Sequence, residues 1–309
     1  MNIHMKGKWL TFVLTDEDAG QSLEQILKDK MSLSGRSIQR LTRMKGIFVN
    51  QKKAFLEKKL KTHDEIKVRV EESNPNIPIF NRTIEVMYED EWILVINKAP
   101  DLKVYPTHAN DVQTLANAIQ FYYQSQKRQA GIHLVHRLDT GTSGAIMVAK
   151  NSYAHQLFDK ELKNNRISRT YIAIIEGAIQ EEVDTINLPI DRCPTHQTKR
   201  CVSKNGEEAI THYQCLGKTK DYSIVKIQIE TGRTHQIRVH FAHLGHPVAG
   251  DRLYGSTNRN ITRQALHAYQ LQWTHPIDDR KQCISAKIPA DIQKLAQHIE
   301  MTEILERLE

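Results

Sequence analysis

The first seventy residues show two helical patterns of apolar positions, followed by two strand patterns. Residues 22–31 place Leu23, Ile26, Leu27 and Met31 on one helical face. A second helix is expected between a capping Ser34 and a terminating glycine at 46. Residues 47–50 and 65–70 have the pattern of short strands, with a basic turn between them. The patterns predict a compact α/β unit of about fifty residues, a size that can fold alone.

The pattern changes after residues 73–81, which contain two prolines and no charge and are the best candidate for a linker. Strands are then expected at 83–88, 92–97, 145–149, 168–175, 208–215 and 222–230. Helices are expected at 113–127, 151–163 and 234–243, and an amphipathic helix is expected in the tail 291–309. This strand-rich order predicts an α+β fold with a mixed, mainly antiparallel sheet. We therefore divide the chain into a small domain (1–72), a linker (73–81), a main domain (82–290) and a helical tail (291–309).

The charge of the chain is concentrated in the small domain. The 309 residues include 43 Lys or Arg and 36 Asp or Glu, a net charge of +7. Residues 28–61 alone hold 11 basic and 2 acidic residues, or +9, which leaves the rest at −2 by difference. A solvated face is the ordinary explanation, but a surplus that recurs on one helix and the next turn favours contact with a polyanion backbone. The candidate contact residues are Arg36, Arg40, Arg43, Lys45, Lys52 and Lys53.

The sequence contains no signal for secretion or for a membrane. The apolar run 9–14 is too short for a signal-peptide core or a membrane span. The four cysteines form no C-x-x-C pair, so neither a zinc site nor a disulfide framework is expected. These features predict a cytoplasmic protein with reduced thiols and no membrane association.

The densest motif is HLVHRLDTGTSGAIMVAK at 133–150. Asp139 follows a strand-like run and precedes a turn of small residues, a position where a scaffold can display a side chain. Gly141 and Gly144 permit positive φ or close backbone approach. A β-turn in which Asp139 caps local amides and a functional carboxylate are about equally good explanations.

A second motif, TGRTHQIRVHFAHLGHPVAGD, spans 231–251. Arg233 lies at a strand-to-helix junction, where its guanidinium could pair with a carboxylate such as Asp139 or with phosphate. His240, His243 and His246 are spaced by three, but a glycine at 245 and a proline at 247 break the helix before the third. Capping or phosphate-contacting histidines are therefore favoured, and no metal site is expected.

A third motif, SRTYIAIIEG at 168–177, alternates as a strand. Tyr171 is either an ordinary strand tyrosine, which periodicity alone favours, or a stacking platform for a nucleobase. Lys98 follows an apolar strand and, considered alone, is an exposed lysine at a strand end.

Taken together, these motifs resemble a known family. HRLDTGTSG at 136–144, SRTYIA at 168–173 and TGRTHQIRVH at 231–240 look like the three signature motifs of the RluA-type RNA pseudouridine synthases. Supporting matches are Asn97-Lys98, PVAGDRLYG at 247–255 and ALHAYQL at 265–271, so the resemblance covers roughly 82–290. Residues 22–70 separately resemble the small RNA-binding domain of a small-subunit ribosomal protein and tyrosyl-tRNA synthetases. The resemblance implies a pseudouridine synthase fold.

The resemblance also implies roles for individual residues. Asp139 matches the essential aspartate, Tyr171 the aromatic residue that stacks on the target base, and Arg233 the basic residue that pairs with the aspartate. Arg137 matches the arginine that helps fill the space left by the flipped nucleotide. Ile237 matches an aliphatic residue that packs on the other side of the base. The matched motifs also place His136 and Lys98 among the substrate-binding residues.

The implied activity is the isomerisation of uridine to pseudouridine in structured RNA, with RNA as partner and a monomeric enzyme. The product is an isomer of the substrate, so no cofactor is required. The appended basic domain favours large-subunit (23S) rRNA as substrate. The alternatives are a tRNA synthase of the same family and a non-catalytic RNA-binding or ribosome-assembly protein. Asn97-Lys98-Ala99-Pro100-Asp101, Thr140-Gly141 and Gly35 depart from the family pattern, which affects target choice rather than the three catalytic positions.

Overall fold

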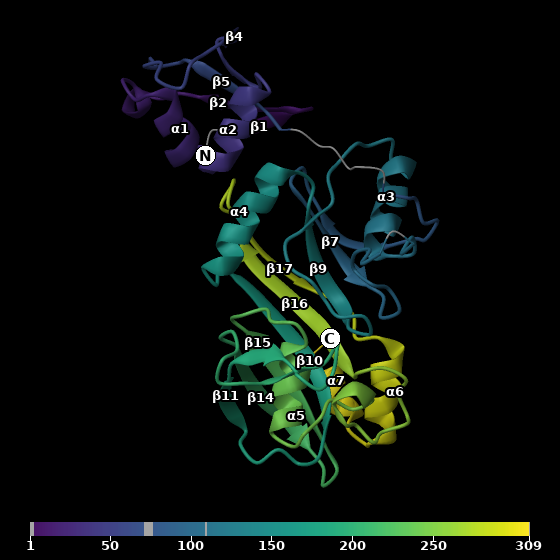
Figure 1. Cartoon of the computed structure of the whole chain (residues 1–309). Coiled ribbons are helices and arrows are strands. Elements are labelled where there is room, and N and C mark those ends of the chain that lie inside the picture. Colours follow the sequence, from purple (N-terminus) through teal and green to yellow (C-terminus); the bar gives the residue numbers. More distant parts are fainter. Residues whose placement is uncertain (1–2, 71–76, 109, 309) are drawn as a thin grey trace.

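The computed structural model describes residues 3–70, 77–108 and 110–308. They form an N-terminal domain, residues 3–70, and a larger main body, residues 77–308 (Figure 1). The N-terminal domain has an antiparallel five-stranded sheet in the order β1-β2-β5-β3-β4. Its strands are β1 (Ile3–Lys6), β2 (Trp9–Val13), β3 (Ile47–Val49), β4 (Lys52–Lys53) and β5 (Glu65–Arg69).

Two capped helices pack on this sheet. The Ser22 hydroxyl accepts a hydrogen bond from the Gln25 amide at 3.3 Å and begins α1 (Leu23–Asp29). Ser34 does the same for α2 (Gly35–Arg43), accepting from the Ser37 amide at 3.2 Å. The apolar face of α1 is fully buried, as its spacing predicts. These two helices confirm the sequence pattern, whereas the strands β1 and β2 were not predicted from it.

The main body is built on a ten-stranded sheet. Its order is β11-β14-β15-β10-β16-β9-β7-β6, with β17 paired to β16 and β8 to β9. Every pairing is antiparallel except that of β16 with β9. The strands are β6 (Glu85–Glu89), β7 (Ile93–Lys98), β8 (His133–Leu134), β9 (Ser143–Ala149), β10 (Ile167–Glu176), β11 (Val183–Asn187), β14 (Ile210–Lys218), β15 (Tyr222–Ile229), β16 (Leu266–Thr274) and β17 (Lys281–Ser285). The predicted α+β class with a mixed, mainly antiparallel sheet is confirmed.

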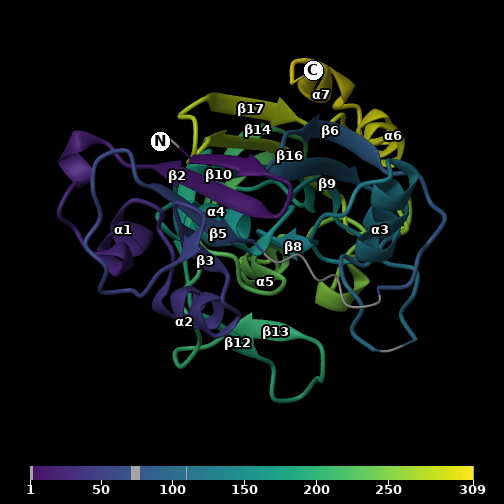
Figure 2. The same ribbon diagram turned by 90° about the horizontal axis from the view of Figure 1, so that it is seen from above.

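Helices cover this sheet, and a hairpin projects from it. The helices are α3 (Leu115–Ser125), α4 (Ser152–Lys163), α5 (Gln236–His243), α6 (Ala290–His298) and α7 (Thr302–Glu306). Figure 2 shows the hairpin of β12 (Ile190–Arg192) and β13 (Arg200–Val202) extending away from the body. The tail forms two helices rather than the single expected helix. The chain reverses between them, where Glu300 takes a positive φ of 58°.

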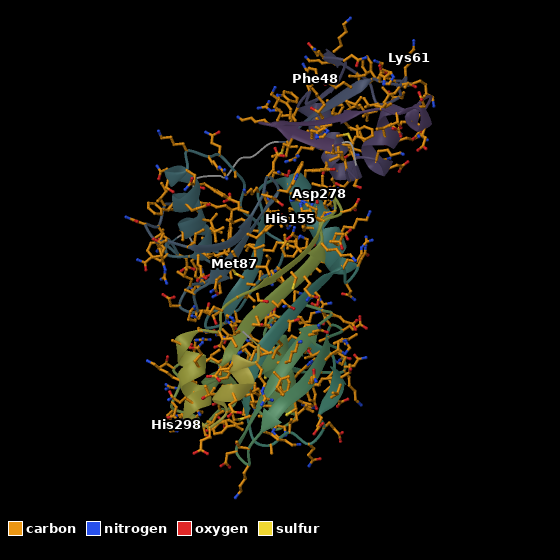
Figure 3. All side chains as sticks on the ribbon, turned by 180° about the vertical axis from the view of Figure 1, so that it is seen from behind. Phe48, Lys61, Met87, His155, Asp278 and His298 are labelled. Carbon is orange, nitrogen blue, oxygen red and sulfur yellow. The ribbon has the colours of Figure 1, made fainter. Side chains whose placement is uncertain are left out.

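The N-terminal domain is docked on α4. The side-chain oxygen of Gln156 accepts hydrogen bonds from the Ser34 amide at 3.2 Å and from the Ser37 hydroxyl at 3.3 Å. The Gln156 amide group in turn donates to the Ser32 carbonyl. Figure 3 shows His155, the neighbour of Gln156, at the end of the main body that faces the N-terminal domain. The start of α2 is thereby held against the main body.

Part of the expected linker lies outside the described residues. Residues 77–81 have no regular structure, but the Asn117 side chain donates to the Pro78 carbonyl at 2.7 Å, so this stretch follows the surface of α3. Within the described ranges, no helix has the length and apolar content needed to span a bilayer.

Candidate active site

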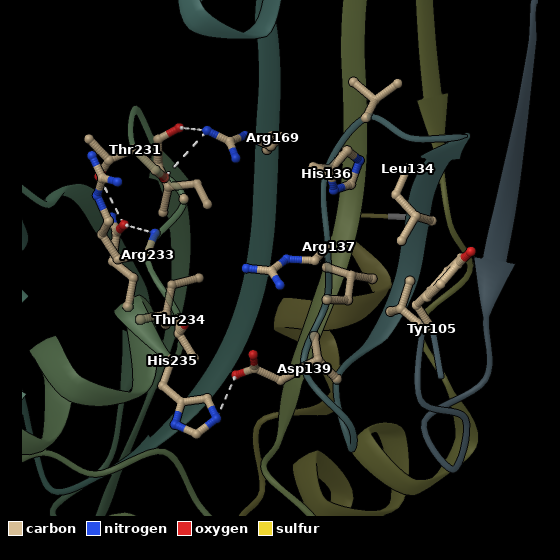
Figure 4. A pocket seen from close by; sticks show the side chains of 18 of the residues that line it. Tyr105, Leu134, His136, Arg137, Asp139, Arg169, Thr231, Arg233, Thr234 and His235 are labelled. Carbon is tan, nitrogen blue, oxygen red and sulfur yellow. Dashed lines mark hydrogen bonds and ion pairs between the residues drawn. The ribbon is translucent and has the colours of Figure 1, made fainter. Parts of the chain in front are cut away.

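All three sequence motifs meet in one cleft of the main body. Its volume is about 1070 Å³, slightly above the ~300–1,000 Å³ typical of small-molecule pockets. Loops 103–107 and 132–142, the end of α4, β10 and the segment 229–238 line it (Figure 4). Six Lys or Arg and three Asp or Glu contribute to the lining, so the cleft favours an anionic ligand although the body as a whole does not.

Asp139 enters this cleft from a tightly held loop. The Gly141 amide donates to the Pro100 carbonyl at 2.8 Å, and Gln264 donates to the Thr140 carbonyl at 2.9 Å. Gly141 has a φ of +89°, and a Cβ there would lie 2.5 Å from the Gln264 side-chain oxygen. The loop therefore needs glycine at this position, as the sequence indicated. Its rigidity fixes the direction in which the Asp139 carboxylate points.

The partner of Asp139 is Arg238, from the buried face of α5. Arg238 Nη1 lies 3.1 Å from Asp139 Oδ2. The other edge of the guanidinium binds Asp251 in bidentate fashion, with Nε–Oδ2 at 2.6 Å and Nη2–Oδ1 at 2.9 Å. Burial lowers the pKa of Arg238, but the hydrogen bonds and charge of Asp251 and Asp139 outweigh it and raise that pKa overall. One buried arginine is thus shared by two carboxylates.

The expected pairing of Arg233 with Asp139 is wrong. Arg233 bonds to the Glu207 carboxylate, and its Nε donates to the Glu208 carbonyl at 2.9 Å. It lines the rim of the cleft, where its side chain is 37% exposed. Arg233 precedes α5, whereas Arg238 is the third residue of α5 and lies on the face that packs toward the loop of Asp139.

A histidine and a tyrosine complete the surroundings of Asp139. His235 Nε2 is 4.0 Å from Asp139 Oδ2 (Figure 4), and its Nδ1 is 2.9 Å from the Tyr254 hydroxyl. Burial lowers the pKa of His235, although the charge of Asp139 acts in the opposite direction, so the imidazole is neutral near neutral pH. The Tyr254 ring also lies 5.0 Å from the Arg238 guanidinium, a cation–π contact.

Tyr171 lies on β10 at the wall of the cleft and is 5% exposed. The register of β10 against β16 shifts between Thr170 and Tyr171, and such a bulge changes the direction of a strand side chain. Burial raises the pKa of Tyr171, and the Asp139 charge acts in the same sense, so the phenol stays neutral. The position is compatible with stacking on a base in the cleft.

Three further expected residues line the same cleft. Figure 4 shows the exposed Arg137 side chain extending between Arg169 and Asp139. Ile237 is 5% exposed and contributes an apolar surface. His136 is buried, with Nε2 accepting from the Met147 amide at 3.2 Å, and burial lowers its pKa to about 3. A neutral His136 shapes the cleft without adding charge.

Lys98 is not the exposed strand-end lysine that its position alone suggested. It is fully buried, outside the lining of the cleft, and its Nζ donates to the carbonyls of Ala99 and Leu102, both at 2.9 Å. Burial and the charge of Arg263 lower the pKa of Lys98 to about 7. The structure gives it a supporting position, because the loop that it holds contains the Pro100 carbonyl that binds Gly141.

Two histidines of the second motif bind protein groups. His240 contacts the Thr211 hydroxyl at 2.9 Å and the Leu188 carbonyl at 3.0 Å, and His246 contacts the Glu176 carbonyl at 2.9 Å. Among the described residues, no group of three or more His, Cys, Asp or Glu is placed to hold a metal ion.

The basic residues of the N-terminal domain lie outside the cleft. All six are exposed, and none forms an ion pair with a described carboxylate. They are Arg36, Arg40, Arg43, Lys45, Lys52 and Lys53. The positive charge of Arg40 contributes, after burial and His155, to lowering the pKa of His133 to about 4.

Sequence reasoning missed four residues around Asp139: Arg238, Asp251, His235 and Tyr254. All four stand within motifs that were recognised, so position alone could not separate them from their neighbours. A signal was present for Arg238, since an arginine among the apolar residues 237, 239 and 241 of a short helix implies a buried charge that needs an acidic partner.

Comparisons with known proteins identify the family to which the chain is similar. Residues 92–243 match the family model described as RNA pseudouridylate synthase. The chain is 37% identical to "Uncharacterized RNA pseudouridine synthase YhcT" of Bacillus subtilis (strain 168), over 96% of this chain and 99% of that one. It is 34% identical to "Ribosomal large subunit pseudouridine synthase D" of Escherichia coli O6:H1, over 93% of each chain.

A solved structure shows the same fold. "Human RNA Pseudouridylate Synthase Domain Containing 1" is similar with a TM-score of 0.55 and 28% identity, covering 71% of this chain and 95% of that one. With the cleft, its carboxylate and these relatives in agreement, the chain belongs to the RluA family of RNA pseudouridine synthases, which are isomerases.

Proposed function

We propose that this synthase isomerises uridines of large-subunit (23S) rRNA and that Asp139 begins the reaction. The observation that supports the role of Asp139 is its carboxylate, held on a rigid loop in a positively charged cleft. Arg238 and His235 both approach Oδ2, so Oδ1 bears neither contact. Support for rRNA comes from the relative named for the ribosomal large subunit, which matches 93% of this chain, and from the basic N-terminal domain.

The reaction exchanges one bond to the ribose for another. The N1–C1′ bond of uridine breaks, the uracil turns within the cleft, and a C5–C1′ bond forms. C5 then loses its hydrogen as a proton and N1 gains one, so atoms balance and no electrons are transferred. Asp139 acts in its ionised form, which a neighbouring guanidinium favours. The walls of the cleft keep the detached base next to the sugar.

The base must leave its stack before Asp139 can reach it, which costs a few kcal/mol. The Tyr171 ring is placed to stack on the extruded uracil, and base–aromatic stacking contributes about 1–3 kcal/mol. Ile237 offers an apolar contact on the other side of the base. Arg137, whose exposed side chain extends into the cleft, can occupy the gap in the RNA. Arg233 at the rim is assigned to the RNA backbone rather than to the carboxylate.

The N-terminal domain captures the RNA in this proposal. Its six exposed cations lack described acidic partners and are therefore available to phosphates. Because Gln156 fixes the start of α2 against α4, and Lys163 at the end of α4 lines the cleft, the basic face and the cleft are joined by a single helix.

Tritium release tests the chemistry. RNA labelled with [5-³H]uridine loses its label when C5 bonds to C1′, so purified protein should release tritium from 23S rRNA transcripts. Asp139→Asn preserves the shape of the side chain but not its charge, and should lower the rate by at least about 10³-fold while RNA affinity is retained. Release by this variant at the wild-type rate would contradict the role of Asp139.

A substrate panel tests the RNA class. Transcripts of 23S rRNA, 16S rRNA and a tRNA pool should be compared at equal uridine concentration. Release from the tRNA pool alone would overturn the rRNA assignment while leaving the enzymatic one intact.

A further inference from the structure

We infer that His235 is a positioning residue that orients Asp139, and that the Tyr254 hydroxyl fixes the imidazole in the required tautomer. The inference rests on the proposed role of Asp139 and adds to it a second contact beside Arg238. It also assigns to Tyr254 a polar function separate from the packing of its ring.

The backbone at His235 has an unusual conformation. It is the N-cap of α5 with φ 59° and ψ 18°, in the left-handed region, whereas N-cap residues are normally extended. Its side chain makes no capping hydrogen bond to the helix. A non-glycine residue in this region carries a conformational cost that its surroundings must offset, and such residues cluster at functional sites. Here the conformation turns the imidazole away from the helix and into the cleft (Figure 4).

The hydrogen bonds around Tyr254 determine which nitrogen of His235 bears the proton. The Arg200 backbone amide donates to the Tyr254 oxygen at 2.9 Å. Because a backbone N–H can only donate, the Tyr254 hydroxyl hydrogen remains available for His235 Nδ1, 2.9 Å away. Nδ1 is then the acceptor, and the neutral imidazole has its hydrogen on Nε2. The chain of donors thus runs from the β13 backbone through Tyr254 to His235.

The hydrogen on Nε2 faces Asp139. Nε2 lies 4.0 Å from Oδ2, the same oxygen that Arg238 Nη1 approaches at 3.1 Å. The longer distance exceeds a hydrogen bond, and catalytic contacts often tighten only when substrate is bound. A neutral donor can hold this oxygen without competing with Arg238 as a second cation. With both donors on Oδ2, the carboxylate plane is set and Oδ1 is directed to the substrate.

The Tyr254 ring has a separate, structural role. It meets the His235 ring edge to face at 5.7 Å and packs in a small apolar cluster with Ile190, Ala209 and Val239. Loss of the ring would disturb Arg238 and the cluster as well as His235. A variant must therefore remove the hydroxyl and leave the ring in place.

Two such variants are available. Tyr254→Phe keeps the ring and removes only the hydroxyl. His235→Asn removes the group that faces Asp139, while asparagine adopts the left-handed conformation readily and its amide can still meet the Tyr254 hydroxyl. Tyr222→Phe is the matched control, because its hydroxyl accepts from Asn258 Nδ2 at 2.9 Å and lies outside the cleft lining.

The experiment measures single-turnover tritium release at saturating RNA, together with RNA affinity and thermal unfolding. His235→Asn should lower the rate about 10- to 100-fold and Tyr254→Phe about 3- to 10-fold, with RNA affinity unchanged. The double variant should be no slower than His235→Asn, because Tyr254 acts through His235. Tyr222→Phe should react at the wild-type rate.

Wild-type rates in both single variants would overturn the inference, as would strictly additive losses or losses seen only in RNA affinity. These outcomes differ from a failure of the proposed function. In that case the wild type itself would release no tritium, or Asp139→Asn would remain active.

Discussion

The cleft and the N-terminal basic face both contain positively charged side chains, but these side chains differ in burial and in pairing. In the cleft, Arg238 is 8% exposed and bonded to two carboxylates. On the N-terminal domain, cations such as Arg40, Arg43, Lys52 and Lys53 are exposed and form no ion pair with a described acid. The buried arginine of the cleft fixes one oxygen of the Asp139 carboxylate. The exposed cations of the basic face are available to the phosphates of a flexible RNA.

The difference follows from solvation. A buried charge is tolerated only when partners replace its water, so the geometry of the cleft depends on every member of its network. Exposed charges keep their water and contribute through counterion release, in which each adds a similar small amount. Single substitutions should therefore be severe in the cleft and mild on the basic face.

The largest effect is expected at Arg238. Arg238→Met leaves Asp251, 3% exposed, as a buried charge without its bidentate partner, which should destabilise the fold by about 3–5 kcal/mol. It also releases Asp139, so tritium release should fall at least about 100-fold. Urea unfolding and the release assay measure the two effects.

Arg233→Met is the matched control for this prediction. Arg233 pairs with Glu207, whose side chain is 71% exposed, so its loss should change stability by less than about 1 kcal/mol. Equal destabilisation by the two substitutions would contradict the distinction between the shared, buried arginine and the one at the rim.

A smaller effect is expected from four substitutions on the basic face. Replacing Arg40, Arg43, Lys52 and Lys53 with Ala should weaken RNA binding and reduce the slope of log K against log salt by up to about 3. The single-turnover rate at saturating RNA should not change. Alanine at Lys220, Lys281, Lys287 and Lys294, which are equally exposed but outside the cleft and the basic face, provides a control of the same charge. An unchanged salt slope in the first variant would show that this face does not track the RNA backbone.

The smallest effect concerns Asp90, a partly buried carboxylate remote from the Asp139 loop. Asp90 accepts from the Trp92 and Ile93 amides at 2.7 and 2.8 Å, from the Tyr88 hydroxyl at 2.8 Å, and lies 3.3 Å from His275. Burial alone would raise the pKa of Asp90, but the nearby His275 ring and the hydrogen bonds from the two amides lower it to about 2.

Because this pKa is below the ordinary 3.8, the stabilisation by Asp90 is complete above pH 4 and is lost as the pH falls toward 2. The loss should be about 2 kcal/mol. Asp90→Asn should flatten the pH dependence of urea unfolding between pH 5 and 2, whereas Asp221→Asn, an exposed control, should not. If the unfolding free energy of Asp90→Asn depended on pH as steeply as that of the wild type, the contacts of the Asp90 carboxylate would not stabilise its ionised form.

Local patterns were enough to predict much of the fold. Ser22 and Ser34 are strong caps, and the helices begin directly after them. The apolar runs that became β7, β9 and β10 are central strands, whose burial on both faces leaves a clear signal. The short strands β12 and β13, with exposed polar residues in a projecting hairpin, have no such signal.

The residues that line the cleft were predicted in part. The loop of Asp139 and the strand of Tyr171 follow from local motifs. The choice between Arg233 and Arg238 does not, because it depends on which face of α5 packs toward the Asp139 loop, 99 residues away in the chain. The prediction that Lys98 is exposed was wrong for a related reason. A lysine at the end of a strand is expected to be exposed, but here the following loop covers it.

The most direct test of the central claim is a map of pseudouridines in 23S rRNA. Cells that lack this protein should be compared with the same cells given back either the wild-type chain or Asp139→Asn. The account predicts that one or a few defined uridines are modified with the wild type and unmodified both without the protein and with the variant. Identical maps in all three strains, or restoration by Asp139→Asn, would contradict it.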